Sequence, residues 1–158
     1  LNCNTNGSLP RRVEQIARAG LHSIRISLNS VLGPAYTAYY QPRYYRWEDV
    51  RESIRRARAL GLYTTINYLV FPGVTDREEE LEGLLDLIRE TGLDMIQMRN
   101  LSIDPELYLR TLPPALGKSI GLRAVLQAIR REFPRVEIGY FNRPKELFGT
   151  CLCETLVF

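Results

Sequence analysis

Apolar residues recur along this chain with two alternating periods. A period of two predicts strands at residues 23–29, 63–71, 95–99 and 136–141, after a short extended run at 2–6. Spacings of three and four predict amphipathic helices at residues 10–19, 47–60, 75–91 and 119–133, with a short one after Asp104. Strands separated by helices are typical of βαβ units, so the pattern predicts an α/β fold with a parallel sheet.

Local signals mark several of the predicted helix ends. Gly20, Gly61 and Gly92 each follow a helical pattern and are expected to terminate it. Thr75 with Glu78 three residues later has the form of a capping box, which predicts a helix that begins at Thr75.

The number of strands limits the architecture. A closed eight-stranded barrel needs roughly 250 residues, whereas this chain has 158. We therefore expect a partial parallel (β/α) barrel, TIM-like, with about five strands and outer helices. It would form one domain at residues 1–144, followed by a tail at 145–158 of uncertain structure. A doubly wound open sheet fits the alternation as well, but no strand is followed by the glycine pattern of dinucleotide-binding folds.

The predicted strands each have one apolar and one polar side. Ile24, Ile26 and Leu28 alternate with Arg25 and polar neighbours, and the later strands repeat the pattern. The polar residues expected near the C-terminal strand ends, where such folds bind ligands, are Thr5, Ser27, Asn29, Asn67, Gln97 and Arg99. Alternatively, the polar side is a buried structural network in which Arg25 pairs with Glu137.

Composition and charge bear on the class of protein and on whether it binds nucleic acid or crosses a membrane. Hydrophobic residues make up 45% and charged residues 25%, which is typical of a globular protein. The net charge of +3 is small, and the Lys and Arg residues are mixed with nearly as many Asp and Glu, so the charge does not by itself argue for a nucleic-acid partner, and none is expected. No apolar run is long enough to cross a membrane.

The three cysteines, Cys3, Cys151 and Cys153, make a poor disulfide framework and favour a reduced, cytoplasmic protein. The Cys-x-Cys pair could bind a metal, but a lone pair without a second Cys/His pair beside it is more often structural, so no metal site is predicted.

A tyrosine-rich segment at residues 36–47 interrupts the βα pattern. It combines five tyrosines with Arg43 and Arg46. We interpret it as a loop that packs on the barrel rim, or alternatively as a platform that stacks a substrate or nucleic acid.

Four segments resemble, in order, the core of radical S-adenosylmethionine (radical SAM) enzymes. Asn4-Thr5-Asn6-Gly7 is similar to the "TNG" that ends a middle strand of that core. Residues 25–30 resemble its next strand, 66–76 the strand and turn after that, and 96–99 the following strand. The resemblance covers about residues 1–143 and implies the C-terminal part of the core barrel.

The resemblance assigns cofactor binding to Thr5, Ser27, Asn29, Asn67, Gln97 and Arg99. Thr5 and Ser27 would contact the methionine or ribose part of S-adenosylmethionine. Asn67, Gln97 and Arg99 would line the cofactor or substrate side of the lumen. Asn29 stands where the family often has Asp. No catalytic residue is implied.

The family's C-x-x-x-C-x-x-C loop, which binds a [4Fe–4S] cluster, has no match here, nor does its "GGE" strand end. Both would lie upstream of Leu1. We therefore expect a fragment of an enzyme whose cofactors are S-adenosylmethionine and the cluster, inactive alone and lining the cavity for cofactor and substrate. Alternatives are a non-catalytic binding module on a partial barrel, or an unrelated partial-barrel enzyme using acid–base chemistry through Glu137.

Overall fold

The five strands within the described residues lie in one parallel sheet, in the order β1-β2-β3-β4-β5. The computed structural model describes residues 1–100, 102–139, 146 and 148. The strands are β1 (Asn2–Thr5), β2 (Ser23–Leu28), β3 (Tyr63–Val70), β4 (Met95–Asn100) and β5 (Glu137–Gly139). The parallel sheet predicted from the sequence is confirmed. The expected end of the last strand, at residues 140–141, lies outside the described residues.

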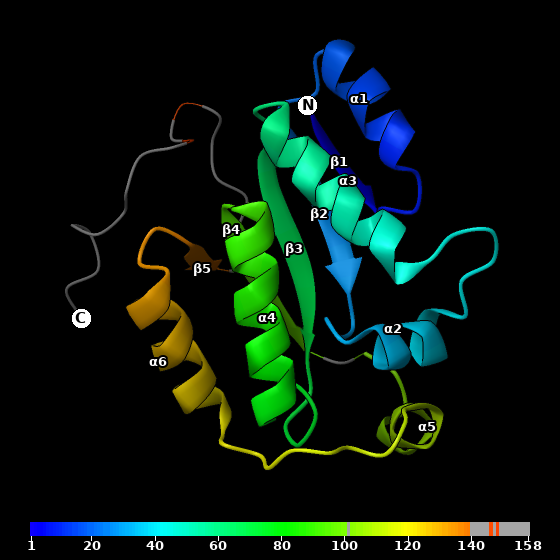
Figure 1. Ribbon diagram of the computed structural model, residues 1–158, viewed down its shortest axis with the longest axis vertical. Coiled ribbons are helices and arrows are strands. Elements are labelled where there is room, and N and C mark those ends of the chain that lie inside the picture. Colours follow the sequence, from blue (N-terminus) through cyan, green and yellow to red (C-terminus); the bar gives the residue numbers. More distant parts are fainter. Residues whose placement is uncertain (101, 140–145, 147, 149–158) are drawn as a thin grey trace.

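The longer helices form one layer over one face of the sheet (Figure 1). They are α1 (Pro10–Arg18), α3 (Trp47–Ala59), α4 (Glu78–Thr91) and α6 (Leu122–Glu132). Two shorter helices, α2 (Gly33–Tyr40) and α5 (Pro105–Thr111), lie at the end of the sheet to which the strands point (Figure 1). Sequential strand order with the helices on one side is the arrangement of a (β/α) barrel segment, so the predicted partial barrel is confirmed.

The core lies between the sheet and this helical layer. Strand register places Ile26, Ile66 and Ile96 side by side on three neighbouring strands, and all three are completely buried. They pack in one cluster with helix residues such as Ile54 of α3 and Leu84 of α4. Burial of each such side chain stabilises the fold by about 1.5–3 kcal/mol.

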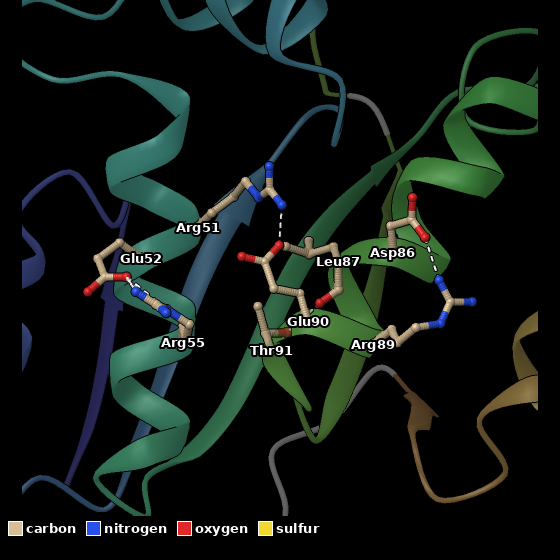
Figure 2. Close-up of polar contacts among 8 residues, drawn as sticks. All are labelled: Arg51, Glu52, Arg55, Asp86, Leu87, Arg89, Glu90 and Thr91. Atoms are coloured by element: carbon tan, nitrogen blue, oxygen red, sulfur yellow. Dashed lines mark hydrogen bonds and ion pairs between the residues drawn. The ribbon is translucent and has the colours of Figure 1, made fainter.

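Solvent-exposed ion pairs lie on helices α3 and α4 of the helical layer (Figure 2). Arg51 of α3 contacts Glu90 of α4, and the two side chains are 40% and 39% exposed. Arg89 contacts Asp86 within α4. Exposed pairs of this kind contribute about 0–1 kcal/mol each. The apolar faces of the helices, rather than these pairs, therefore hold the layer in place.

The predicted capping box at Thr75 is wrong. Helix α4 begins at Glu78, residues 72–76 form a turn before it, and Arg77 makes an isolated antiparallel bridge with Ser119. The Thr75 hydroxyl accepts a hydrogen bond from Phe71 N (2.8 Å) and donates to Leu69 O (3.1 Å). Thr75 thus stabilises the end of β3, because its side chain is turned toward the strand that precedes it.

The tyrosine-rich segment is also different from its prediction as a loop. Its residues 36–40 form the second part of α2, which begins at Gly33 and ends at Tyr40. Tyr36 is completely buried, and its ring lies 4.7 Å from that of Tyr40 and 4.9 Å from that of Trp47. Aromatic contacts within and beyond the helix stabilise it, although its sequence has no one-sided apolar pattern.

Strand register places polar side chains on the opposite face of the sheet, among them Arg25, Ser27 and Asn67. In the described part of the chain no helix covers this face (Figure 1). The pairing of Arg25 with Glu137 proposed from the sequence is not among the ion pairs of the described residues. Register explains why, since Arg25 and Glu137 stand three strand spacings apart, about 14 Å across the sheet. At its N-terminal edge this face is covered by Phe148, whose ring stacks on Tyr63 at 4.4 Å.

Candidate functional site

A cavity opens at the C-terminal ends of β2, β3 and β4, where the fold predicts a ligand site. Its volume is about 180 Å³. Four of the six residues predicted from the sequence line it, namely Ser27, Asn29, Asn67 and Arg99. Ligand pockets usually measure roughly 300–1,000 Å³. The cavity is smaller than this range, so it has room for only one part of a cofactor or for a small substrate.

Ser27 and Asn67 reach the cavity from adjacent strands. The two residues are register partners, and Gln97 is the next partner on β4. Gln97 is 1% exposed and lies outside the cavity lining; its Oε1 accepts a hydrogen bond from Arg99 Nη2 (3.4 Å). Gln97 thus contacts a lining residue without lining the cavity itself.

Two amide oxygens at the cavity lack hydrogen-bond partners within the described residues. Asn29 Nδ2 donates to Ala35 O (3.2 Å), but Asn29 Oδ1 has no partner. The same is true of Asn67 Oδ1, and both oxygens are buried. Leaving a buried acceptor unsatisfied costs about 1–3 kcal/mol. The two oxygens fit a ligand that carries hydroxyl or amino donors.

An aromatic wall contributed by α2 completes the cavity. Tyr39 and Tyr40 both line it, and the Tyr40 hydroxyl donates to Ser27 O (3.2 Å). Burial raises the pKa of Tyr40, so its hydroxyl remains a donor at neutral pH. The Tyr39 ring meets the Tyr108 ring edge-on at 5.5 Å. The sequence shows these tyrosines plainly, but their assignment to a rim loop missed their place at the site.

The polar face next to the cavity carries positive charge. Arg25 is 8% exposed, and its Nη1 donates to Asn4 Oδ1 (3.4 Å). Burial and then the charge of Arg99 lower the pKa of Arg25. Its Nε has no hydrogen-bond partner among the described residues. The guanidinium groups of Arg25 and Arg99 lie on the same polar face of the sheet. Together they favour a ligand with a carboxylate or another anionic group.

Thr5 is not brought to the cavity. Its register partner is Ile26, which places it on the helix-covered side of the sheet rather than with Ser27. Its hydroxyl accepts from Gly7 N (3.1 Å), and Asn6 Oδ1 accepts from Ser8 N (3.1 Å). The Thr5-Asn6-Gly7 motif therefore forms a pair of side-chain turns that start the connection to α1.

The described residues offer no set of ligands for an iron–sulfur cluster. No group of three or more His, Cys, Asp or Glu residues within that part of the chain is arranged to hold a metal ion. Cys3 is a free cysteine, and Cys151 and Cys153 lie outside the described residues. None of the described helices has the length and apolar character that crossing a bilayer requires.

Comparison with solved structures shows the same fold in larger proteins. A radical SAM methyltransferase from Sphaerobacter thermophilus shares 17% identity at a TM-score of 0.55, over 95% of this chain and 42% of that one. Streptococcus suis SuiB bound to S-adenosylmethionine shares 15% identity at a TM-score of 0.60, over 91% of this chain and 33% of that one. The chain thus spans less than half the length of these neighbours. No curated protein matches it.

The sequence itself carries a family match. The profile of the radical SAM superfamily covers residues 1–88, which include β1, β2, β3 and most of α4. This match spans more than half of the 158 residues, and the fold agrees with it over nearly the whole chain. The chain therefore belongs to the radical SAM superfamily.

Proposed function

We propose that this chain is part of a radical SAM enzyme core and that its polar sheet face lines the cavity for S-adenosylmethionine and substrate. The observation that carries the proposal is the convergence of Ser27, Asn29, Asn67 and Arg99 at one cavity. Family membership makes S-adenosylmethionine the first ligand to consider there.

Each lining residue suits a particular part of that ligand. Ser27 and the unpartnered oxygens of Asn29 and Asn67 would hold its hydroxyl and amino groups. Arg99, with Arg25 nearby, would hold a carboxylate of the cofactor or substrate. When bound, the [4Fe–4S] cluster supplies the electron that begins radical chemistry on S-adenosylmethionine. We propose that the ligands of this cluster lie outside the described residues, in the remainder of a larger enzyme.

The test is to measure S-adenosylmethionine affinity in the complete protein that carries this sequence. Ser27→Ala and Arg99→Ala should each weaken binding about ten- to a hundredfold, the usual effect of losing a hydrogen bond to a charged group. Iron content should stay at the wild-type level, because neither residue is a cluster ligand in the proposal.

Arg56→Ala is the matched control. Arg56 lies on α3, is partly exposed and pairs with Glu52, far from the polar face. If Arg99→Ala and Arg56→Ala bind S-adenosylmethionine equally well, Arg99 does not contact the cofactor. If the complete protein binds S-adenosylmethionine but holds no iron, the protein is a non-catalytic binding module rather than a radical SAM enzyme. The acid–base alternative lacks support at this site, since Glu137 is not among the residues that line the cavity.

A further inference from the structure

A carboxylate is buried beneath the cavity, on the helix-covered side of the sheet. Glu80, in the first turn of α4, is 2% exposed. Its Oε1 accepts hydrogen bonds from Val31 N (2.8 Å) and from the Tyr68 hydroxyl. Its Oε2 accepts from the Ser30 hydroxyl (2.6 Å). One side chain thus joins α4 to β3 and to the segment that follows β2.

That segment, residues 29–32, connects directly to the cavity. It begins with Asn29, whose side chain lines the cavity, and it leads into α2, which carries Tyr39 and Tyr40. The Ser30 hydroxyl also accepts from Leu32 N (3.0 Å). Glu80 therefore holds the segment through Ser30 and through the backbone of Val31.

Two further contacts fix the same segment. A side-chain carbon added at Gly83 of α4 would lie 3.0 Å from Val31 Cγ2 and 3.2 Å from Leu32 Cδ2, so glycine lets the helix and the segment approach closely. From the other side, the Tyr108 hydroxyl of α5 donates to Asn29 O (3.4 Å). The segment is thus held between α4 and α5.

Packing alone does not account for a carboxylate at this position. Burying a charged group is unfavourable unless donors surround it, and an apolar residue of similar size often stabilises a fold equally well. Burial raises the pKa of Glu80 above its ordinary value, and the hydrogen bonds from Ser30, Tyr68 and Val31 offset this only in part. Two of these hydrogen bonds, from Val31 N and from the Ser30 hydroxyl, give residues 30 and 31 a defined position.

We propose that Glu80 is a positioning residue of the ligand site: it fixes residues 29–32 and so sets Asn29 and the tyrosines of α2 against the cavity. The identity of the ligand rests on the proposed function, but the positioning role does not. In this proposal the two carboxylate oxygens of Glu80 hold residues 29–32 by accepting their hydrogen bonds.

The experiment compares Glu80→Ala with Glu80→Gln in the complete protein. Glu80→Ala removes the acceptors, so amide exchange at Val31 and Leu32 should accelerate at least about tenfold and S-adenosylmethionine affinity should fall by about the same factor. Glu80→Gln keeps one acceptor oxygen for Val31 N and should restore most of both properties. Iron content should remain unchanged in both variants.

Asp94→Ala is the matched control. Asp94 is a half-buried carboxylate, 21% exposed, that pairs with Arg58 and accepts from a backbone amide, Thr64 N (2.7 Å), at the opposite end of the sheet. The Asp94→Ala substitution should lower the stability of the protein without changing amide exchange at Val31 or the affinity for S-adenosylmethionine. Ser30→Ala is the second variant if Glu80→Ala does not fold, and it should accelerate exchange at Leu32.

The possible outcomes separate the two proposals. Unchanged exchange at residues 31–32 in Glu80→Ala and Ser30→Ala overturns the positioning role, as does an equal loss of affinity in Asp94→Ala. If the wild-type complete protein does not bind S-adenosylmethionine, the proposed function fails. The exchange measurements then still decide whether Glu80 positions the segment.

Discussion

At the scale of single residues, the carboxylate of Asp76 stabilises the fold through the hydrogen-bond donors around it. Asp76 accepts hydrogen bonds from Gly73 N and from the Ser119 hydroxyl (2.7 Å), and so ties the turn after β3 to the loop before α6. Burial raises the pKa of Asp76, but these hydrogen bonds outweigh it and bring the pKa below its ordinary value. Asp76 therefore stabilises the fold in its ionised form.

We predict that Asp76→Asn lowers the free energy of unfolding by about 1.5–3 kcal/mol at pH 7, the value of hydrogen bonds to a charged group. Because the folded pKa lies below the unfolded one, the contribution is present above the unfolded pKa and is lost as the pH falls through the folded pKa. Urea unfolding of both proteins at pH 7 and at about pH 3 measures this. A difference that grows toward low pH contradicts the prediction.

At the scale of elements, the turn between β1 and α1 depends on one glycine. Gly7 has φ of 69°, and a side-chain carbon there would lie 3.1 Å from Ile26 Cγ2 and 3.2 Å from Val50 Cγ1. Its carbonyl accepts from the buried Ser53 hydroxyl (2.6 Å). The turn is thus packed against both the sheet and α3.

We predict that Gly7→Ala destabilises the protein more than Gly61→Ala does. Gly61 also has positive φ, 75°, but nothing lies within 4 Å of the added carbon. Both variants carry the cost of a left-handed backbone, about 1–2 kcal/mol, and only Gly7→Ala adds overpacking of about 1–3 kcal/mol. Thermal and urea unfolding give the comparison, and equal losses would show that packing at Gly7 is unimportant.

At the scale of the whole molecule, the missing feature is a cluster-binding loop. The sequence has three cysteines and no C-x-x-x-C-x-x-C pattern, whereas the family's cluster takes three closely spaced thiolates. We predict that the 158-residue chain, reconstituted anaerobically with iron and sulfide, holds no stoichiometric [4Fe–4S] cluster and does not cleave S-adenosylmethionine. Iron analysis and absorbance measure this. A stoichiometric cluster would contradict it, and alanine variants of Cys3, Cys151 and Cys153 would then identify the ligands.

The cytoplasmic location and the domain boundary at residue 144 also concern the whole molecule, and both stay predictions.

The sheet itself was predictable from local patterns in the sequence. A period of two follows from backbone geometry within each strand, so the sequence alone assigns Ser27 and Asn67 to one face and Ile26 and Ile66 to the other, and strand register agrees. The order of the family-like motifs extended this to the fold class.

Tertiary structure decided how these elements meet. A one-residue difference in register turns a side chain to the other face, and the pairing of β1 with β2 thereby sends Thr5 to the helix side. Ring contacts of Tyr36 with Tyr40 and Trp47, rather than a periodic pattern, stabilise the first part of the tyrosine-rich segment as helix α2, which lines the cavity. The partners of Glu80 include Ser30, 50 residues away. The strands and their polar sides follow from local geometry in the sequence, whereas the cavity and its support depend on contacts between distant residues that form only in the folded chain.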